Sequence, residues 1–198
     1  MELKNSMISY SELKKGVKIV FEEEPHEVVD AQFIKMAQRR PVMQTTLRNL
    51  ITGTVRKVTF QQGDMLEEVE LERVSLKFLY SHRGVYYFCL PDNPSQRFSF
   101  NEEQIGKSAG FLKPNTIVEG LVFKEKIINI LLPIKIQLKV KETGPGIKGD
   151  RSKSGTKTAI LETGIEMQVP LFIEPGDIIE VNTESGEYVK RIDSSLNS

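Results

Sequence analysis

The stretch IKIQLKV, residues 134–140, decides the fold class of this 198-residue chain. Aliphatic residues take every second position in it, and lysine or glutamine takes the positions between them. Side chains alternate between the two faces of a β-strand, so this period of two predicts a strand with one buried and one solvated face. The buried face is expected to carry Ile134, Ile136, Leu138 and Val140, and the solvated face Lys135, Gln137 and Lys139.

Further short segments upstream are of the same strand-like kind. They alternate or are rich in β-branched and aromatic residues, and turn signals such as PDNP at 91–94 and KPN at 113–115 separate them. Helical signals are few: Ser9 and Glu12 have capping-box spacing, and NEEQIG at 101–106 predicts one more short helix. The chain is therefore expected to be all-β. The other clear strand candidates are residues 17–21, 26–34, 42–50, 54–60, 76–80 and 85–90.

Strands this short and this closely spaced are typical of small barrels. Two seams divide the chain, one at the acidic stretch GDMLEEVE (63–70) and one at 133–136. We therefore expect three small barrels, in domains at 1–68, 69–135 and 136–198. Domains of this size bury a modest share of their own surface, so neighbouring barrels are expected to pack on one another.

The net charge and the hydropathy of the chain bear on its partners and its location. The chain has 27 Lys and Arg residues against 27 Asp and Glu residues, so its formal net charge of zero indicates no particular partner. It contains no apolar run of the length that a membrane span or a secretion signal needs. We expect a cytoplasmic protein without a membrane partner.

Residues that could carry catalysis or bind a metal are scarce. Cys89 is the single cysteine and lies in the apolar run VYYFCL, where a buried hydrophobic role is the usual one. His26 and His82 have no Cys companions at metal-binding spacing. Paired acids such as Glu102 and Glu103 lie in polar turns, as solvated surface acids do. We expect no enzymatic activity, and no catalytic residue, metal or cofactor.

Positive charge is concentrated in residues 31–63, which carry six Lys and Arg residues and no Asp or Glu. Such a stretch can be the footprint of a polyanion, because cations near phosphates gain counterion-release free energy. It is also what a solvated strand face looks like, so both interpretations remain open. The candidate RNA-binding residues along the hairpin face are Arg48, Arg56 and Lys57.

The loop KMAQRRP at 35–41 is the most specific part of this stretch. It brings three cations to the tip between two strand-like segments, and a tip can enter a narrow site that a flat barrel face cannot. Arginine suits phosphate contacts because of its planar fork of donors. An ordinary exposed hairpin tip is the alternative. The candidate tRNA-binding residues at the tip are Lys35, Gln38, Arg39 and Arg40.

A second basic loop lies at 144–159. Its GPGIKG matches G-x-G-x-x-G, but a dinucleotide site needs that motif to open a helix, and here it leads into another strand-like segment. Backbone amides and cations in such a loop can instead hold RNA phosphates. The candidate RNA-binding residues are Lys148, Gly149, Asp150, Arg151, Lys153 and Lys157.

The stretch KTAILETGIEMQVPLFIEPG at 157–176, followed by DIIEVNTESGEYVKR at 177–191, resembles the C-terminal signature of the bacterial elongation factor P family in order and spacing. Met167 stands in place of an aliphatic residue. The resemblance extends from about residue 7 to 192, and residues 1–6 look like an extra leader. The upstream segments that resemble the family are MISYSELKKG from Met7, LRNLITG at 47–53 and KETGPGIKGD at 141–150.

The resemblance implies an N-terminal SH3-like (KOW-type) barrel followed by two OB-fold barrels, arranged in an L shape. It implies a monomeric translation elongation factor that binds the ribosome between the P and E sites. There the tip of the first domain would approach the acceptor end of the P-site tRNA, and the factor would promote peptide bond formation at polyproline stalls. Partners would be rRNA, the P-site tRNA and the E-site codon.

The chain also departs from the family pattern at the tip and in the third-domain loop. Gln38 occupies the position where the family carries a modified lysine or a glycosylated arginine, and it can take neither modification. Three alternatives stay open: the tip acts unmodified, Arg39 takes over by a one-residue shift, or the chain belongs to the elongation-factor-P-like paralogues. In the third domain the family's Gly-Asp-Thr loop reads Gly149, Asp150 and Arg151 here.

A second function class stays open alongside the ribosomal one. Stacked OB barrels can also form a free-standing protein that binds single-stranded RNA through aromatic and cationic side chains. The absence of Trp and an aromatic content of 8% argue against an extensive stacking surface.

Overall fold

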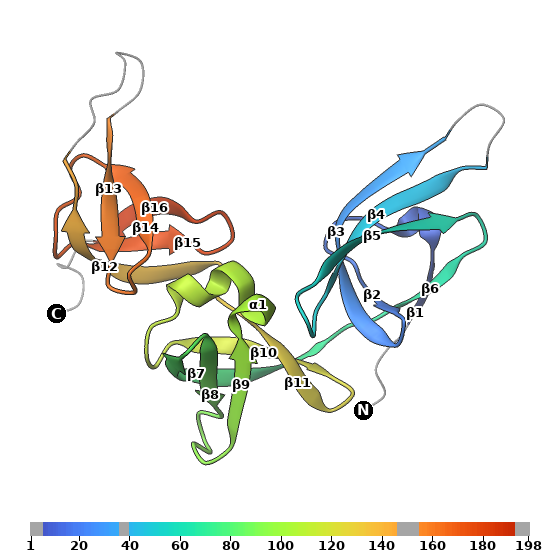
Figure 1. Cartoon of the computed structure of the whole chain (residues 1–198), viewed down its shortest axis with the longest axis horizontal. Coiled ribbons are helices and arrows are strands. Elements are labelled where there is room, and N and C mark those ends of the chain that lie inside the picture. Colours follow the sequence, from blue (N-terminus) through green and yellow to red (C-terminus); the bar gives the residue numbers. More distant parts are fainter. Residues whose placement is uncertain (1–5, 36–39, 146–154, 193–198) are drawn as a thin grey trace. The chain divides into compact units, whose positions relative to one another are not determined.

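The computed structural model describes residues 6–35, 40–145 and 155–192. Strands dominate these residues and form three curled sheets, each built from strands close together in the sequence (Figure 1). The expected all-β fold of small, barrel-like modules is therefore confirmed.

The N-terminal sheet has six strands in the order β1-β6-β2-β3-β4-β5, and every neighbouring pair is antiparallel. Strand β6 falls within the acidic stretch expected to be a seam, and it pairs with both β1 and β2. The fully buried side chains of Ile19, Val28 and Leu47 lie in the core of this module. The strands are β1 (Ser6–Ser9), β2 (Lys18–Phe21), β3 (Glu24–Ile34), β4 (Val42–Asn49), β5 (Val55–Gln61) and β6 (Met65–Glu68).

Two short helical turns form where the sequence predicted them. The turn η1 (Tyr10–Glu12) has Ser9 as its N-cap, and the Glu12 side chain accepts a hydrogen bond from the Ser9 N–H at 2.7 Å. Helix α1 (Glu102–Ile105) has Asn101 as its N-cap, with Gln104 as the reciprocal partner. Both predicted helical turns are confirmed. Each forms because its cap satisfies backbone donors at the helix start.

The middle sheet has the strand order β11-β10-β7-β8-β9. Its short helices, α1 and η2 (Gly106–Phe111), follow β9 and precede β10 in the chain. Cys89 is fully buried, as expected for a small hydrophobic residue. The strands are β7 (Glu72–His82), β8 (Val85–Cys89), β9 (Arg97–Asn101), β10 (Ile117–Phe123) and β11 (Lys126–Leu131).

The C-terminal sheet has the antiparallel order β14-β13-β12-β15-β16. The IKIQLKV stretch forms its central strand, with Leu138 and Val140 buried and Lys139 exposed. The expected burial of Ile134 is wrong: this residue precedes the strand and is 55% exposed. The strands are β12 (Lys135–Thr143), β13 (Thr156–Leu161), β14 (Glu166–Pro170), β15 (Ile178–Asn182) and β16 (Glu187–Ile192).

Contacts divide the chain into two compact units, and the residues of the middle sheet are shared between them. The first unit comprises Met1–Val74, Phe100–Gly106 and Gly120–Ile130. Within it, the buried Asn129 amide donates hydrogen bonds to the carbonyls of Leu50 and Gln104, both at 3.0 Å. This side chain therefore links β11 to the segments around Leu50 and Gln104, which are distant from it in the sequence.

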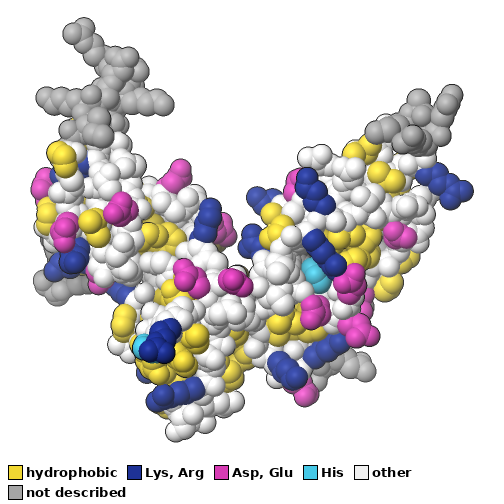
Figure 2. All heavy atoms as spheres, in the orientation of Figure 1, with side chains coloured by type: hydrophobic (Ala, Val, Ile, Leu, Met, Phe, Trp, Pro, Cys, Tyr) yellow, Lys and Arg dark blue, Asp and Glu magenta, His cyan; other side chains and the backbone are white. Residues whose placement is uncertain are grey.

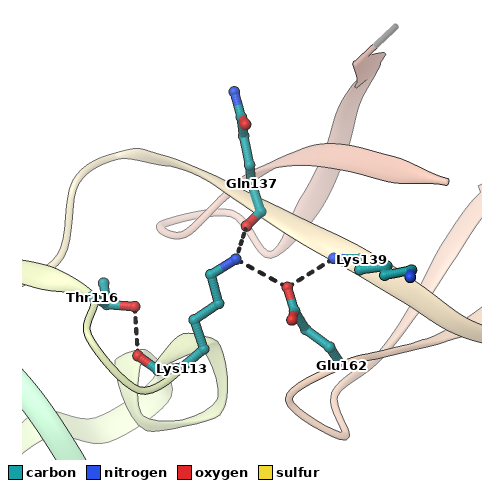
Figure 3. Close-up of polar contacts among 5 residues, drawn as sticks. All are labelled: Lys113, Thr116, Gln137, Lys139 and Glu162. Atoms are coloured by element: carbon teal, nitrogen blue, oxygen red, sulfur yellow. Dashed lines mark hydrogen bonds and ion pairs between the residues drawn. The ribbon is translucent and has the colours of Figure 1, made fainter. Parts of the chain in front are cut away.

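The second unit comprises Ser75–Ser99, Lys107–Glu119 and Leu131–Ser198. Phe111, at the end of η2, is buried in the same hydrophobic cluster as the core of the C-terminal sheet. The Lys113 ammonium donates to the Gln137 carbonyl and to the Glu162 carboxylate, each at 3.0 Å (Figure 3). Hydrophobic packing by Phe111 and the polar contacts of Lys113 thus hold the 107–119 segment in the second unit.

Candidate nucleic-acid interface

The β3–β4 hairpin carries the candidate tip. Its last paired residues are Ile34 and Val42, and the next described residues are Lys35 and, before Pro41, Arg40. Both side chains are exposed, and neither forms an ion pair with another described residue. The structure therefore places two exposed cations at the end of this hairpin, both without an ion-pair partner among the described residues. Gln38 and Arg39, also predicted at the tip, lie outside the described residues.

Two of the three cations predicted along the hairpin share the outer face of the sheet. Strand pairing sets Arg48 opposite Val55 and Lys57 opposite Thr46, so both point away from the buried face that contains Leu47. Both side chains are exposed to solvent. They are available for a surface contact.

Arg56 points to the other face of the same sheet. Its strand partner is Leu47, its guanidinium lies 4.7 Å from the centre of the Phe21 ring, and its Nη2 lies 2.6 Å from a Glu22 carboxylate oxygen. The structure thus does not bring Arg56 together with Arg48 and Lys57. Its charge is already matched by an acid within the module.

Acidic residues from the start of β3 also lie on the outer face. Glu27 is the strand partner of Arg48, and Asp30 is paired with Thr46, whose other partner is Lys57. Figure 2 shows Lys and Arg side chains interspersed with Asp and Glu side chains over this module. The positive excess of residues 31–63 is therefore offset along the sheet, whereas at the hairpin end no described acid is ion-paired with Lys35 or Arg40.

The late basic loop is described only at its edges. Lys148, Gly149, Asp150, Arg151 and Lys153 lie outside the described residues. Lys157 is a buried residue of β13, and its ammonium lies 2.9 Å from a Glu174 carboxylate oxygen. An ammonium held in this way is less available to a phosphate than an exposed one. The prediction that Lys157 contacts RNA remains untested.

An open groove of about 840 Å³ in the first unit was not found by the sequence analysis. Its lining combines lysines before and at the start of β2 with residues at and after the end of β6, which lie about fifty positions later in the chain. A window of local charge does not detect such a group, because its members meet only after the sheet has formed. The charged lining residues are Lys14, Lys15, Lys18, Glu68, Glu70 and Arg73.

Within the described ranges, no three His, Cys, Asp or Glu side chains are grouped in a way that could hold a metal ion. The described residues also contain no helix with the length and apolar character of a membrane span.

Two family models match the chain. One, described as elongation factor P (EF-P) KOW-like domain, matches residues 9–66, and the other, described as elongation factor P, C-terminal, matches residues 136–191. The elongation factor P of Thermodesulfovibrio yellowstonii is 39% identical over 186 residues, covering 94% of this chain and 99% of that protein. The elongation factor P of Carboxydothermus hydrogenoformans is 37% identical over 186 residues, covering 94% of this chain and 100% of that protein.

Among solved structures, the eukaryotic translation initiation factor 5A from Methanococcus jannaschii is similar with a TM-score of 0.46 at 15% identity. The similarity covers 64% of this chain and 95% of that one. A similarity this low carries no argument about function.

Proposed function

Because this chain belongs to the elongation factor P family and is a translation elongation factor, we propose that it acts between the ribosomal P and E sites. There it positions the P-site peptidyl-tRNA and promotes peptide bond formation at polyproline stalls. The observation that carries this proposal is the end of the β3–β4 hairpin, where Lys35 and Arg40 are exposed cations without an ion-pair partner among the described residues.

The factor contributes orientation, and the ribosome carries out the reaction. Proline is a poor nucleophile with a fixed ring, and a nascent prolyl chain strains the geometry at the reaction centre. Holding the tRNA end in register recovers rate, because correct placement of reacting groups lowers the barrier without any catalytic side chain. No residue of this chain is assigned a catalytic role.

Four residues form the proposed contact with the tRNA terminus: Lys35, Gln38, Arg39 and Arg40. The cations engage phosphates of the acceptor end, and arginine does so through two parallel donors. Gln38 takes the place of the residue that the family modifies, so contact by this tip depends on its arginines. Arg48 and Lys57 on the outer face of the sheet are proposed to contribute weaker backbone contacts, since the adjacent Glu27 and Asp30 offset their charge.

In the third module, the loop that contains Lys148, Gly149, Asp150, Arg151 and Lys153 is proposed to face the small subunit near the E-site codon. We propose that the factor works there as a monomer and that it needs no cofactor.

Co-sedimentation with ribosomes tests the proposed location. The protein should pellet with 70S ribosomes that carry an initiator or peptidyl tRNA in the P site, and should pellet less with empty ribosomes. Binding to naked single-stranded RNA combined with no ribosome association would reject the proposal and favour a free-standing RNA-binding protein.

A further inference from the structure

Two tyrosines stack on the outer surface of the β7–β8 hairpin. Tyr80 and Tyr87 are strand partners, their ring centres lie 4.8 Å apart, and their planes differ by 25°. Tyr80 is 45% exposed. Neither phenol oxygen has a hydrogen-bond partner among the described residues.

A β-bulge places Tyr80 on this surface. Phe78 is buried, and the strand period of two would put Tyr80 on the same buried face. The pairing register shifts between Phe78 and Tyr80, so Tyr80 lies opposite Tyr87, whereas Phe78 lies opposite the buried Phe88. Bulges commonly redirect a side chain at a functional site.

The hairpin turn places a cation beside the tyrosine pair. Arg83 and Gly84 form the two-residue turn, with φ of 49° and 74°, between the partners His82 and Val85. Turns with two positive φ values favour Asn-Gly, yet this chain also places charged residues at such positions in Glu22-Glu23 and Lys124-Glu125. His82 is exposed and follows Tyr80 by two positions, on the same face of β7.

The chain segment that contains this hairpin has an excess of positive charge. Residues 75–99 contain Lys77, Arg83 and Arg97 against the single acid Asp92. None of these three cations is ion-paired within the part of the chain that the structure describes. Figure 2 shows Lys, Arg and His side chains beside hydrophobic ones over this hairpin, at the lower left of the view.

We propose that this surface, defined by Tyr80, His82, Arg83 and Tyr87, binds an unpaired RNA base. The base stacks on the exposed tyrosine ring, and Arg83 contacts the neighbouring phosphate. A cross-strand tyrosine pair would stabilise the hairpin by itself. That role does not account for the bulge or for the cations that lack an ion-pair partner among the described residues, whereas aromatic rings among cations are the usual platform for single-stranded nucleic acid. OB-fold barrels commonly use this hairpin region for such contacts.

An NMR titration of the ¹⁵N-labelled full chain with a 12-nucleotide oligoadenylate RNA tests the proposal. Shifts should concentrate in residues 79–88. The double variant Tyr80→Leu/Tyr87→Leu should bind about tenfold or more weakly at this site, because it keeps apolar bulk and loses the aromatic faces. The control Tyr80→Phe/Tyr87→Phe keeps the rings and should bind as the wild type does.

Arg83→Asn provides a second test that does not threaten the fold, because Asn suits the turn better than Arg does. It should leave the spectrum dispersed and lower the slope of log affinity against log salt by about one. The proposal is overturned by an absence of shifts in residues 79–88, or by unchanged affinity of the leucine variant. Equal shifts with an oligoglutamate peptide would also overturn it and would indicate a protein-binding surface.

The titration contains no ribosome. A negative result therefore leaves the proposed role at polyproline stalls to its own tests, and a failure of that role would not remove the base-binding site.

Discussion

The Lys113 ammonium and the Glu162 carboxylate are 3.0 Å apart and form an ion pair within the second unit (Figure 3). The same carboxylate accepts a hydrogen bond from the Lys139 N–H at 2.9 Å. Burial by itself would raise the pKa of Glu162. The hydrogen bonds from Lys139 and Lys113, together with the charges of both lysines, outweigh that effect and hold the pKa below its ordinary value.

This carboxylate should make the stability of the second unit depend on pH. A carboxyl group whose pKa is lower in the folded than in the unfolded state stabilises the folded state at a pH above its unfolded pKa of about 4.5. This stabilisation is lost as the pH falls through the folded pKa. Glu162→Gln should therefore lower the melting temperature at pH 7 and lower it less at pH 3. The loss should stay below about 1 kcal/mol, because the pair is partly exposed.

The matched control is Glu142→Gln, which removes an exposed carboxylate whose lysine partner is also exposed. It should leave the melting temperature unchanged at both pH values. An equal loss for Glu162→Gln at pH 7 and pH 3 would contradict the assigned role of the ion pair.

The Asn129 amide should be costly to replace. It is buried, donates to two carbonyls and accepts a hydrogen bond from the Ile130 N–H at 2.7 Å. Asn129→Leu has a similar volume but leaves these groups unpaired, so it should destabilise the first unit by at least about 2 kcal/mol in urea unfolding. Asn93→Ala, at an exposed loop position, should change stability by less than about 0.5 kcal/mol.

Gly53 should tolerate alanine less well than Gly16 does. Both have positive φ, of 78° and 91°, but a Cβ at Gly53 would collide with the Glu103 carbonyl, whereas a Cβ at Gly16 would meet open space. Gly16→Ala should cost about 1–2 kcal/mol from backbone conformation alone. Gly53→Ala should cost clearly more in the same urea titration, and equal losses would show that the collision is relieved by a backbone shift.

The hairpin end should matter for activity rather than for folding. Arg40→Ala should reduce polyproline stall relief several-fold. Its free energy of unfolding, measured by thermal melting, should stay within about 0.5 kcal/mol of the wild-type value, as is usual for exposed loops. Lys126→Ala removes an exposed cation of β11 and is the control. A parallel loss of stability and activity in Arg40→Ala would count against a contact role.

The sequence predicted the strand content well, because alternation reports directly on burial. It placed Leu138 and Val140 in the core correctly. It misplaced Ile134, because a period of two does not tell where a strand begins. It also did not find that Tyr80 faces outward, since a single bulge reverses the alternation beyond it.

The candidate site was harder to predict than the fold. Arg56 and Lys57 are neighbours on one strand and must point to opposite faces, so their separation was available from the sequence. The proximity of Glu27 to Arg48 was not, because it depends on the register of β3 against β4. Charge counted along the chain therefore overestimated the positive character of the sheet.

The most direct test of the central claim is in vitro translation of a reporter with consecutive prolines and of a matched reporter without them, with and without the purified protein. The protein should give more full-length product from the proline reporter and no change for the matched one, and the double variant Lys35→Ala/Arg40→Ala should lose the effect. Unchanged stalling with folded wild-type protein would contradict it.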